Sequence, residues 1–149
     1  MKAVLQRVSS ASVTVDNKEV SHIGTGLMIL LGIQKGDTDD DRDYLLHKIP
    51  RLRIFPDDDG VMNRDITEID GEILLVSQFT LLASTKKGNR PSYIEAEEPA
   101  LAEERYTEIA VRLGEILGKP IQRGIFGADM HVTLTNDGPV TILIDSRAR

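Results

Sequence analysis

The chain contains no cysteine and no tryptophan, and it has only three phenylalanines and three tyrosines among 149 residues. The lack of cysteine excludes disulfide bridges, thiolate nucleophiles and thiolate-ligated metals. With so few aromatic rings, the core is expected to consist of aliphatic side chains. A long apolar run is also absent, because the longest, residues 27–33, falls well short of the roughly 20 residues of a transmembrane helix. We therefore expect a cytoplasmic protein without membrane association.

An excess of positive charge is absent as well. The chain has 18 Lys and Arg against 24 Asp and Glu, which gives a formal net charge of -6. This balance argues against indiscriminate coating of nucleic acid, although a local basic site stays open. The length and the hydrophobic fraction of 40% are typical of one globular domain. We expect residues 1–149 to form that single domain.

Alternating and continuous apolar stretches predict a chain rich in β-strands. Residues 2–8 and 11–16 are rich in valine and separated by two serines, which predicts either a strand pair or one bent strand. Residues 26–33 are continuously apolar, as is typical of a strand covered on both faces. Further strands are expected at residues 19–23, 51–55, 72–82, 121–126, 131–135 and 140–145.

Two principal helices are expected besides the strands. Asp37 and Thr38 can cap a helix that starts near Asp39, and Pro50 should end or kink it near Lys48. Pro99 suits the first turn of a second helix, whose apolar residues recur at helical spacing until Gly118. The pattern therefore predicts an α+β fold, a single strand-dominated domain with a sheet or barrel-like architecture and two principal helices.

Two groups of residues that suggest metal sites have more ordinary interpretations. The acidic residues 57–59, followed by Gly60, resemble a calcium loop, but their spacing does not match the EF-hand and favours a solvated turn. His22, His47 and His131 lie on different elements, so a zinc site or a histidine base would require convergence in the folded chain. The motifs of serine hydrolases, P-loops and dinucleotide sites are missing. We expect no metal and no cofactor.

Polar side chains interrupt the apolar stretch at residues 76–82. Alternation along a strand would place Ser77 and Phe79 on one face and Gln78 and Thr80 on the other. Such residues suit the polar floor of a pocket, where N–H groups and hydroxyls meet a ligand carbonyl. The spacing alone equally fits a strand end whose hydroxyls bond to neighbouring backbone.

A second polar stretch is NDGPVT at residues 136–141. Asn-Asp-Gly is strong turn chemistry and predicts a hairpin between the last two strands. The bond between Gly138 and Pro139 is a candidate for the cis form, which X-Pro bonds adopt at low cost and which exposes two carbonyls on one side. A rigid tip of that kind would suit a site that excludes groups sterically.

A compact basic loop lies beside the polar strand. Lys86, Lys87 and Arg90 place three cations within residues 86–90. Such a run is usually a solvated surface. In an acidic chain it is also a candidate for a local phosphate-binding site.

Four motifs occur together in this chain: SQFTL at 77–81, GNRPSY at 88–93, FGADM at 126–130 and NDGPVT at 136–141. In this order and in a chain of this length, they resemble the D-aminoacyl-tRNA deacylase family of bacteria and eukaryotes. The resemblance extends from the opening MKAVLQRV to the final strand. It implies a cytoplasmic homodimer that hydrolyses the ester linking a D-amino acid, or glycine, to tRNA.

The resemblance also implies roles for individual residues. The first signature of the family is matched by Ser77, Gln78, Phe79 and Thr80. These residues would line the site for the aminoacyl group and the terminal adenosine. Phe126 and Met130 fall in the motif of the adenosine site. Asn136, Gly138 and Pro139 match the second signature, in which a cis Gly-Pro pair enters the partner subunit's pocket. Arg7 matches an arginine that positions this pair, and Lys86, Lys87 and Arg90 are expected to contact tRNA.

The mechanism that the resemblance implies relies on the RNA. The 2′-hydroxyl of the terminal adenosine would assist the attacking water or attack the ester itself. N–H groups around Gln78 and Phe79 would stabilise the oxyanion that forms. Thr80 would position the reacting groups. Gly138 and Pro139 carbonyls would exclude L side chains, whereas glycine would not be excluded. A nucleophilic Thr80 stays open, although no base is visible in the sequence. The alternatives are a noncatalytic dimeric nucleic-acid-binding protein and a small-molecule esterase.

Overall fold

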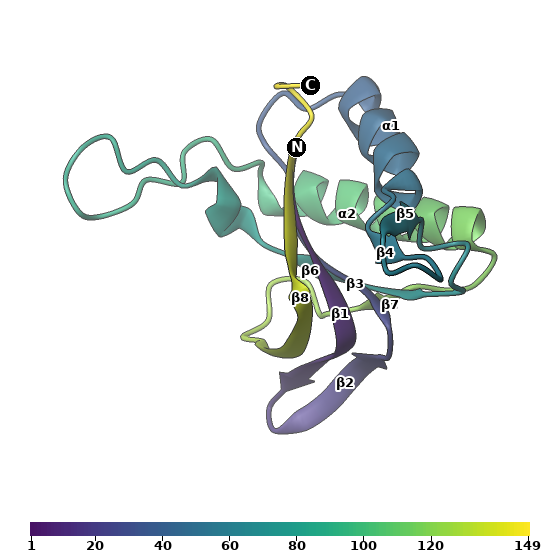
Figure 1. Cartoon of the computed structure of the whole chain (residues 1–149). Helices are drawn as coiled ribbons and strands as arrows, with labels where there is room; N and C mark the ends of the chain where they lie inside the picture. Colours follow the sequence, from purple (N-terminus) through teal and green to yellow (C-terminus); the bar gives the residue numbers. More distant parts are fainter.

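A mixed six-stranded sheet forms the centre of the computed structural model, which describes residues 1–149 (Figure 1). Its strands are β1 (Lys2–Val15), β2 (Lys18–Ile23), β3 (Gly26–Gly32), β6 (Glu72–Ser77), β7 (Gln122–Arg123) and β8 (His131–Asp145). The order is β2-β1-β3-β6-β7, with β8 also paired to β1. The pairs β3–β6 and β6–β7 are parallel, and the others are antiparallel. The sheet curls into a barrel-like form, which confirms the predicted α+β class.

The strand β1 is continuous and irregular. Its first half pairs with β3 and its second half with β2, while β8 accompanies it from Lys2 to Thr14. The register with β8 shifts between Gln6 and Val8 and again between Val8 and Ser10. The prediction of one bent strand is therefore confirmed. The alternative of a strand pair is wrong, because the serines stay within the strand and form no turn.

The first helix, α1 (Asp39–Lys48), begins and ends where the sequence predicts. The Asp41 carboxylate accepts a hydrogen bond from the Thr38 N–H at 2.8 Å, which completes the capping arrangement. Burial opposes ionisation of Asp41, but hydrogen bonds from Thr38 and Ser146 outweigh it and lower the pKa of Asp41 to about 2. Pro50 lies in the 3-10 turn η1 (Ile49–Arg51) that follows directly.

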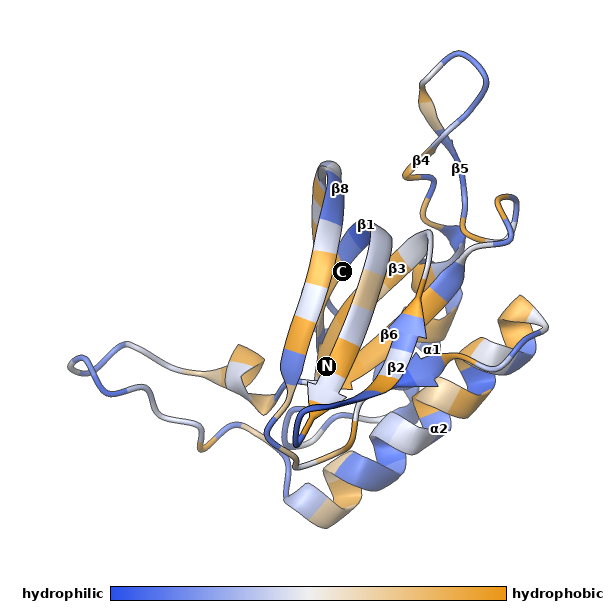
Figure 2. Cartoon of the chain, turned by 90° about the horizontal axis from the view of Figure 1, so that it is seen from below, coloured by the Kyte–Doolittle hydropathy of each residue, from blue (hydrophilic) through white to orange (hydrophobic).

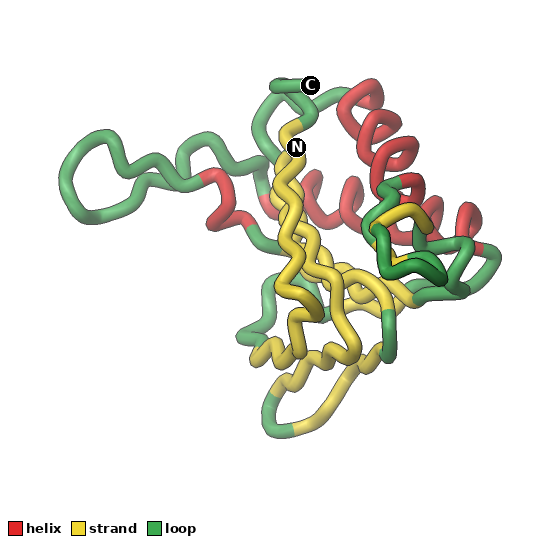
Figure 3. The backbone as a smooth tube through the Cα atoms, viewed as in Figure 1, coloured by secondary structure: helices red, strands yellow, loops and turns green.

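Both helices pack on one face of the sheet (Figures 1 and 3). The second, α2 (Pro99–Leu117), has an apolar side and a polar side (Figure 2). It ends at Gly118, where the sequence predicts the stop, and the φ of 71° is left-handed, as is common for a glycine after the last helical turn. The helices and the sheet enclose a cluster of 21 buried residues, and a second cluster of 7 lies among β1, β2, β3 and β6. Neither helix is long and apolar enough to cross a membrane.

Three predicted strands are wrong in extent. Residues 51–55 contribute only to β4 (Phe55–Pro56), which pairs with β5 (Met62–Arg64), because η1 takes up the start of that stretch. Residues 121–126 provide only β7, since β6 offers them partners only at Leu74 and Leu75.

The prediction of a strand over residues 72–82 also fails beyond Ser77. The last ladder pair joins Leu31 to Ser77, because the partner strand β3 ends at Gly32. The chain then forms the 3-10 helix η2 (Phe79–Leu82). The alternation of faces expected from Ser77 to Thr80 is therefore wrong.

The predicted hairpin at residues 136–141 is wrong as well. Gln6 pairs with Thr141 and Val8 pairs with Asn136, so Arg7 alone lies opposite residues 137–140. We call these four residues the bulge. The chain continues in the same direction after it, because both halves of β8 find their partner in the single long strand β1. The turn residues therefore interrupt one strand and do not join two.

Candidate functional site

A pocket of about 270 Å³ lies where β6, η2 and α2 meet. Ser77, Gln78 and Phe79 from the first signature line it, together with Phe126 from the FGADM motif. These residues come from two distant parts of the sequence, which the fold brings together. The remaining wall is mainly apolar, as is typical of a site for a small organic group.

The polar groups of Gln78 in the pocket lining, and of Thr80 next to it outside the lining, are already oriented. The Gln78 N–H donates a hydrogen bond to the Leu31 carbonyl at 2.8 Å, which fixes the end of β6. The Gln78 side-chain amide donates to the Thr80 hydroxyl. No carboxylate, imidazole or amine hydrogen-bonds to Thr80, so no group is placed to take its proton. Phe79 and Thr80 are the first two residues of η2. Their N–H groups therefore have no hydrogen-bond acceptor within that helix.

Two residues with ionisable side chains line the pocket and were not recognised as site residues from the sequence. Tyr106 donates its hydroxyl hydrogen bond to the Leu75 carbonyl at 2.7 Å, and its ring lies 5.9 Å from that of Phe126. Burial raises the pKa of Tyr106 to about 12, against a smaller opposing effect of Arg123, so this phenol is neutral at physiological pH. Glu97 supplies a carboxylate to the wall.

The bulge is held by the buried side chain of Arg7. The Arg7 Nε donates to the Asp137 carbonyl at 3.1 Å and Nη1 donates to the Ile54 carbonyl at 2.6 Å. The Asp137 carboxylate lies 3.4 Å from Arg7 Nε. The Val140 N–H donates to the Asn136 side chain at 3.0 Å, across the base of the bulge. One guanidinium thus ties the bulge to the segment before β4.

Gly138 and Pro139 form the exposed end of the bulge, and the bond between them is cis. Neither residue lines the pocket of its own chain, and the same is true of Arg7 and Asn136. Met130 packs against the smaller core cluster, outside the pocket lining. Within one chain, the residues predicted for the aminoacyl and adenosine site therefore divide between the pocket and the bulge, with Met130 outside both.

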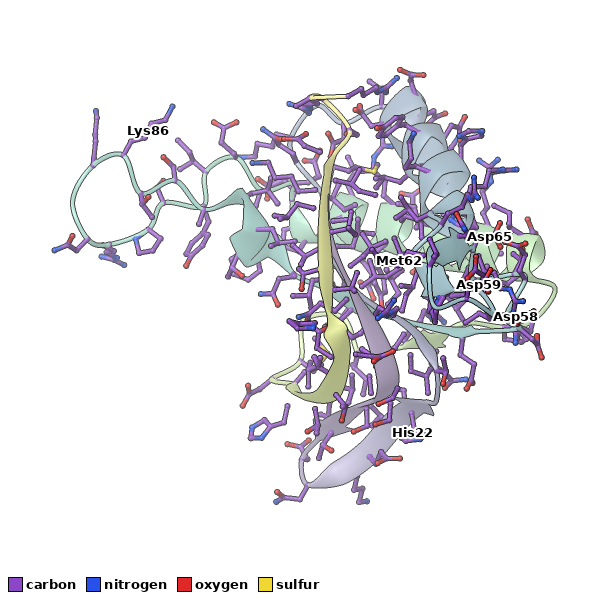
Figure 4. The ribbon with its side chains drawn as sticks, viewed as in Figure 1. His22, Asp58, Asp59, Met62, Asp65 and Lys86 are labelled. Atoms are coloured by element: carbon purple, nitrogen blue, oxygen red, sulfur yellow. The ribbon has the colours of Figure 1, made fainter.

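Residues 83–94 form an arm that extends away from the sheet (Figures 1 and 3). Ser84 and Ser92 close its base through two backbone hydrogen bonds of 2.8 and 2.9 Å. Lys86 lies near its far end and points outward (Figure 4). Lys86, Lys87 and Arg90 are exposed, and none of them forms an ion pair. The arm is therefore an uncompensated positive surface.

The residues that suggested metal sites serve other purposes. Asp57 accepts hydrogen bonds from the N–H groups of Asp59 and Val61 and from the Asn63 side chain, as in a turn. Hydrogen bonds, first that from Asn63, lower the pKa of Asp57. His22 lies on β2, far from the labelled acidic residues of the β4–β5 segment (Figure 4). No group of three or more His, Cys, Asp and Glu side chains is arranged to hold a metal ion.

The sequence matches known proteins along almost its whole length. Residues 4–145 match the model of the D-Tyr-tRNA(Tyr) deacylase family. D-aminoacyl-tRNA deacylases of Parabacteroides distasonis and Christiangramia forsetii are 56% and 54% identical to it, over 99% and 100% of this chain and 98% and 99% of theirs.

Two solved structures have the same fold. A structure titled c-Myc DNA Unwinding Element Binding Protein is 41% identical, with a TM-score of 0.92 over 97% of this chain and 98% of that one. A probable eukaryotic D-amino acid tRNA deacylase is 17% identical, with a TM-score of 0.82 over 96% of this chain and 97% of that one. The second likeness concerns the fold alone.

Proposed function

The chain belongs to the family of D-aminoacyl-tRNA deacylases, ester hydrolases of tRNA editing, and from that premise we propose how its own residues carry out the reaction. The terminal adenosine of the charged tRNA enters the pocket at η2, with the ester carbonyl near the Phe79 N–H. The observation that carries this proposal is the pocket itself, which joins polar groups of the first signature to Phe126.

The 2′-hydroxyl of the terminal adenosine is proposed to activate the ester or the attacking water. The pocket supports this because Thr80 has no base beside it and Tyr106 already donates its hydroxyl to a carbonyl. The Gln78 N–H is engaged by Leu31, so we assign oxyanion stabilisation to the Phe79 N–H. Thr80, held by the Gln78 amide, would then position the reacting groups.

A homodimer would complete the site. The exposed Gly138 and Pro139 do not line the pocket of their own chain, so a partner subunit is needed to bring them to it. The strand β8 pairs only with β1, which leaves one long edge free for another chain, and Leu143 on it is 77% exposed. We propose that the partner's bulge closes the pocket and that its carbonyls exclude L side chains. Glycine, which has no side chain, would not be excluded.

The proposed function is tested by comparing release of D-tyrosine, L-tyrosine and glycine from their charged tRNAs by the purified protein. Release of D-tyrosine and glycine, with L-tyrosyl-tRNA left intact, is expected. Equal release of both tyrosine enantiomers would contradict the proposed chiral exclusion. Sedimentation of the same preparation determines whether the active species is a dimer.

We expect Thr80→Ala to lower turnover of D-tyrosyl-tRNA by about tenfold or less. The substitution removes one hydrogen-bonded hydroxyl, and such a contact contributes roughly 1 kcal/mol. Loss of a true nucleophile costs far more, about 10⁶ in kcat in a serine protease. Single-turnover rates distinguish the two cases, and a trapped ester on Thr80 would reverse the assignment.

The arm is proposed to bind tRNA phosphates through its cations. Replacing Lys86, Lys87 and Arg90 together by alanine should weaken tRNA binding and reduce the slope of log affinity against log salt by about two to three. Binding measured at several salt concentrations checks this. A matched triple variant at Lys18, Lys48 and Arg53, elsewhere on the surface, should leave the slope unchanged. Unchanged affinity and slope in the arm variant would make the arm only a solvated surface.

A further inference from the structure

An exposed aromatic pair joins the pocket to the base of the arm. The rings of Phe79 and Tyr93 meet edge to face, with centroids 5.2 Å apart and ring planes at 74°. Phe79 is 58% exposed and Tyr93 39% exposed. Phe79 also lines the pocket, whereas Tyr93 directly follows the Ser84–Ser92 pairing at the base of the arm. A chain with three phenylalanines and three tyrosines thus places one of each together at its surface.

Both rings are held by ordered backbone. Phe79 begins η2, and the Tyr93 carbonyl accepts a hydrogen bond from the Ala96 N–H at 3.0 Å. In an edge-to-face pair, each ring has at least one face that the partner ring does not cover. A flat third group can therefore stack on the pair without disrupting it.

We propose that this aromatic pair stacks against the penultimate base of the tRNA while the terminal adenosine occupies the pocket. The proposal rests on the function proposed above. Three features follow one another along the surface: the pocket, the aromatic pair at the base of the arm, and the cations farther along the arm. The unpaired 3′ end of tRNA has the same order, with the terminal nucleoside, the preceding base and then the preceding phosphates. Aromatic rings stack on any base, and cations without ion pairs suit the phosphates.

The first test replaces Tyr93, because its ring lies outside the pocket lining. We expect Tyr93→Ala to raise KM for D-tyrosyl-tRNA roughly tenfold, as one lost stacking contact predicts, without a matching fall in kcat. Tyr93→Phe keeps the ring and should restore the wild-type KM. Val111→Ala is the matched control, because Val111 is 55% exposed on α2 and belongs to no part of the proposed site.

The second test removes the base from the RNA. With a D-tyrosyl-tRNA that is abasic at the penultimate position, wild-type protein should show the same rise in KM, and Tyr93→Ala should add nothing to it. If Tyr93→Ala raises KM equally on the intact and the abasic substrate, the stacking proposal is overturned. The proposal is also overturned if Tyr93→Ala changes the oligomeric state of the protein in solution, since the aromatic pair would then belong to a subunit interface. Wild-type protein without activity on intact D-tyrosyl-tRNA would instead refute the proposed function.

Discussion

Gly138→Ala is expected to lower turnover of D-aminoacyl-tRNA about 100-fold, as misplacement of positioning groups by about 1 Å does in enzymes. At Gly138 φ is 130°, and an added Cβ would lie 2.8 Å from the Val140 side chain and 3.1 Å from Arg7 Nη2. These two residues hold the bulge, so relief of the contact moves the exposed end that we place in the partner's pocket. Single-turnover release of D-tyrosine from charged tRNA measures the effect.

Gly60→Ala provides the matched control. Gly60 also has a positive φ, 79°, but an added Cβ would meet no atom within 4 Å. Alanine at Gly60 lies close to the left-handed region and costs about 1–2 kcal/mol there. Alanine at Gly138 has a φ farther outside the regions open to L residues and meets a collision as well, so it is strained more. Thermal unfolding of the two variants compares their stability. If Gly138→Ala turns over like Gly60→Ala, the bulge has no part in the reaction.

Removal of the 2′-hydroxyl from the terminal adenosine should lower the hydrolysis rate between roughly 100-fold and 10,000-fold, the range for loss of a general acid or base. The reason is that the protein offers no evident base: the hydroxyl of Thr80, next to the pocket, is hydrogen-bonded only to the Gln78 amide, and Tyr106 in the pocket wall is neutral with a pKa of about 12. The measurement is single-turnover hydrolysis of D-tyrosine from tRNA ending in 2′-deoxyadenosine, with the amino acid on the 3′-hydroxyl.

Glu97→Gln is the necessary comparison, because Glu97 brings a carboxylate to the pocket wall. One of its carboxylate oxygens accepts the Glu98 N–H at 2.9 Å, so we expect this variant to lose much less activity than the 2′-deoxy substrate does. A larger loss from Glu97→Gln than from the 2′-deoxy substrate would assign the base to the protein and overturn the RNA-assisted mechanism.

Elements that depend on local chemistry could be predicted from the sequence. Thr38 and Pro50 delimit α1, and Pro99 and Gly118 delimit α2, because caps, prolines and left-handed glycines act within one turn of helix. The ends of strands depend on partners far away in the sequence. Residues 79–82 look like the end of a strand and form η2, because the ladder with β3 ends at the pair of Leu31 and Ser77.

In the candidate site too, local motifs could be predicted from the sequence and long-range packing could not. Ser77, Gln78 and Phe126 are found in motifs, and the structure brings them to one pocket. Tyr106 and Glu97 carry no motif, because a tyrosine on the apolar side of a helix and a glutamate before its first turn are ordinary there. Which part of α2 reaches the pocket is decided by how the helix packs on the sheet, and a single sequence does not contain that information.

The bulge, residues 137–140, can change in length without changing how the strands on either side of it pair in the sheet. Val8 with Asn136 and Gln6 with Thr141 form pairs on either side of it, so each half of β8 keeps its register with β1 whatever the chain does between them. Residues could be inserted there or removed without a slip in the strand. Folding therefore places little restriction on the length of this segment. Variants with a longer or shorter bulge would therefore test the chiral exclusion that we propose for it while the barrel-like sheet stays as it is.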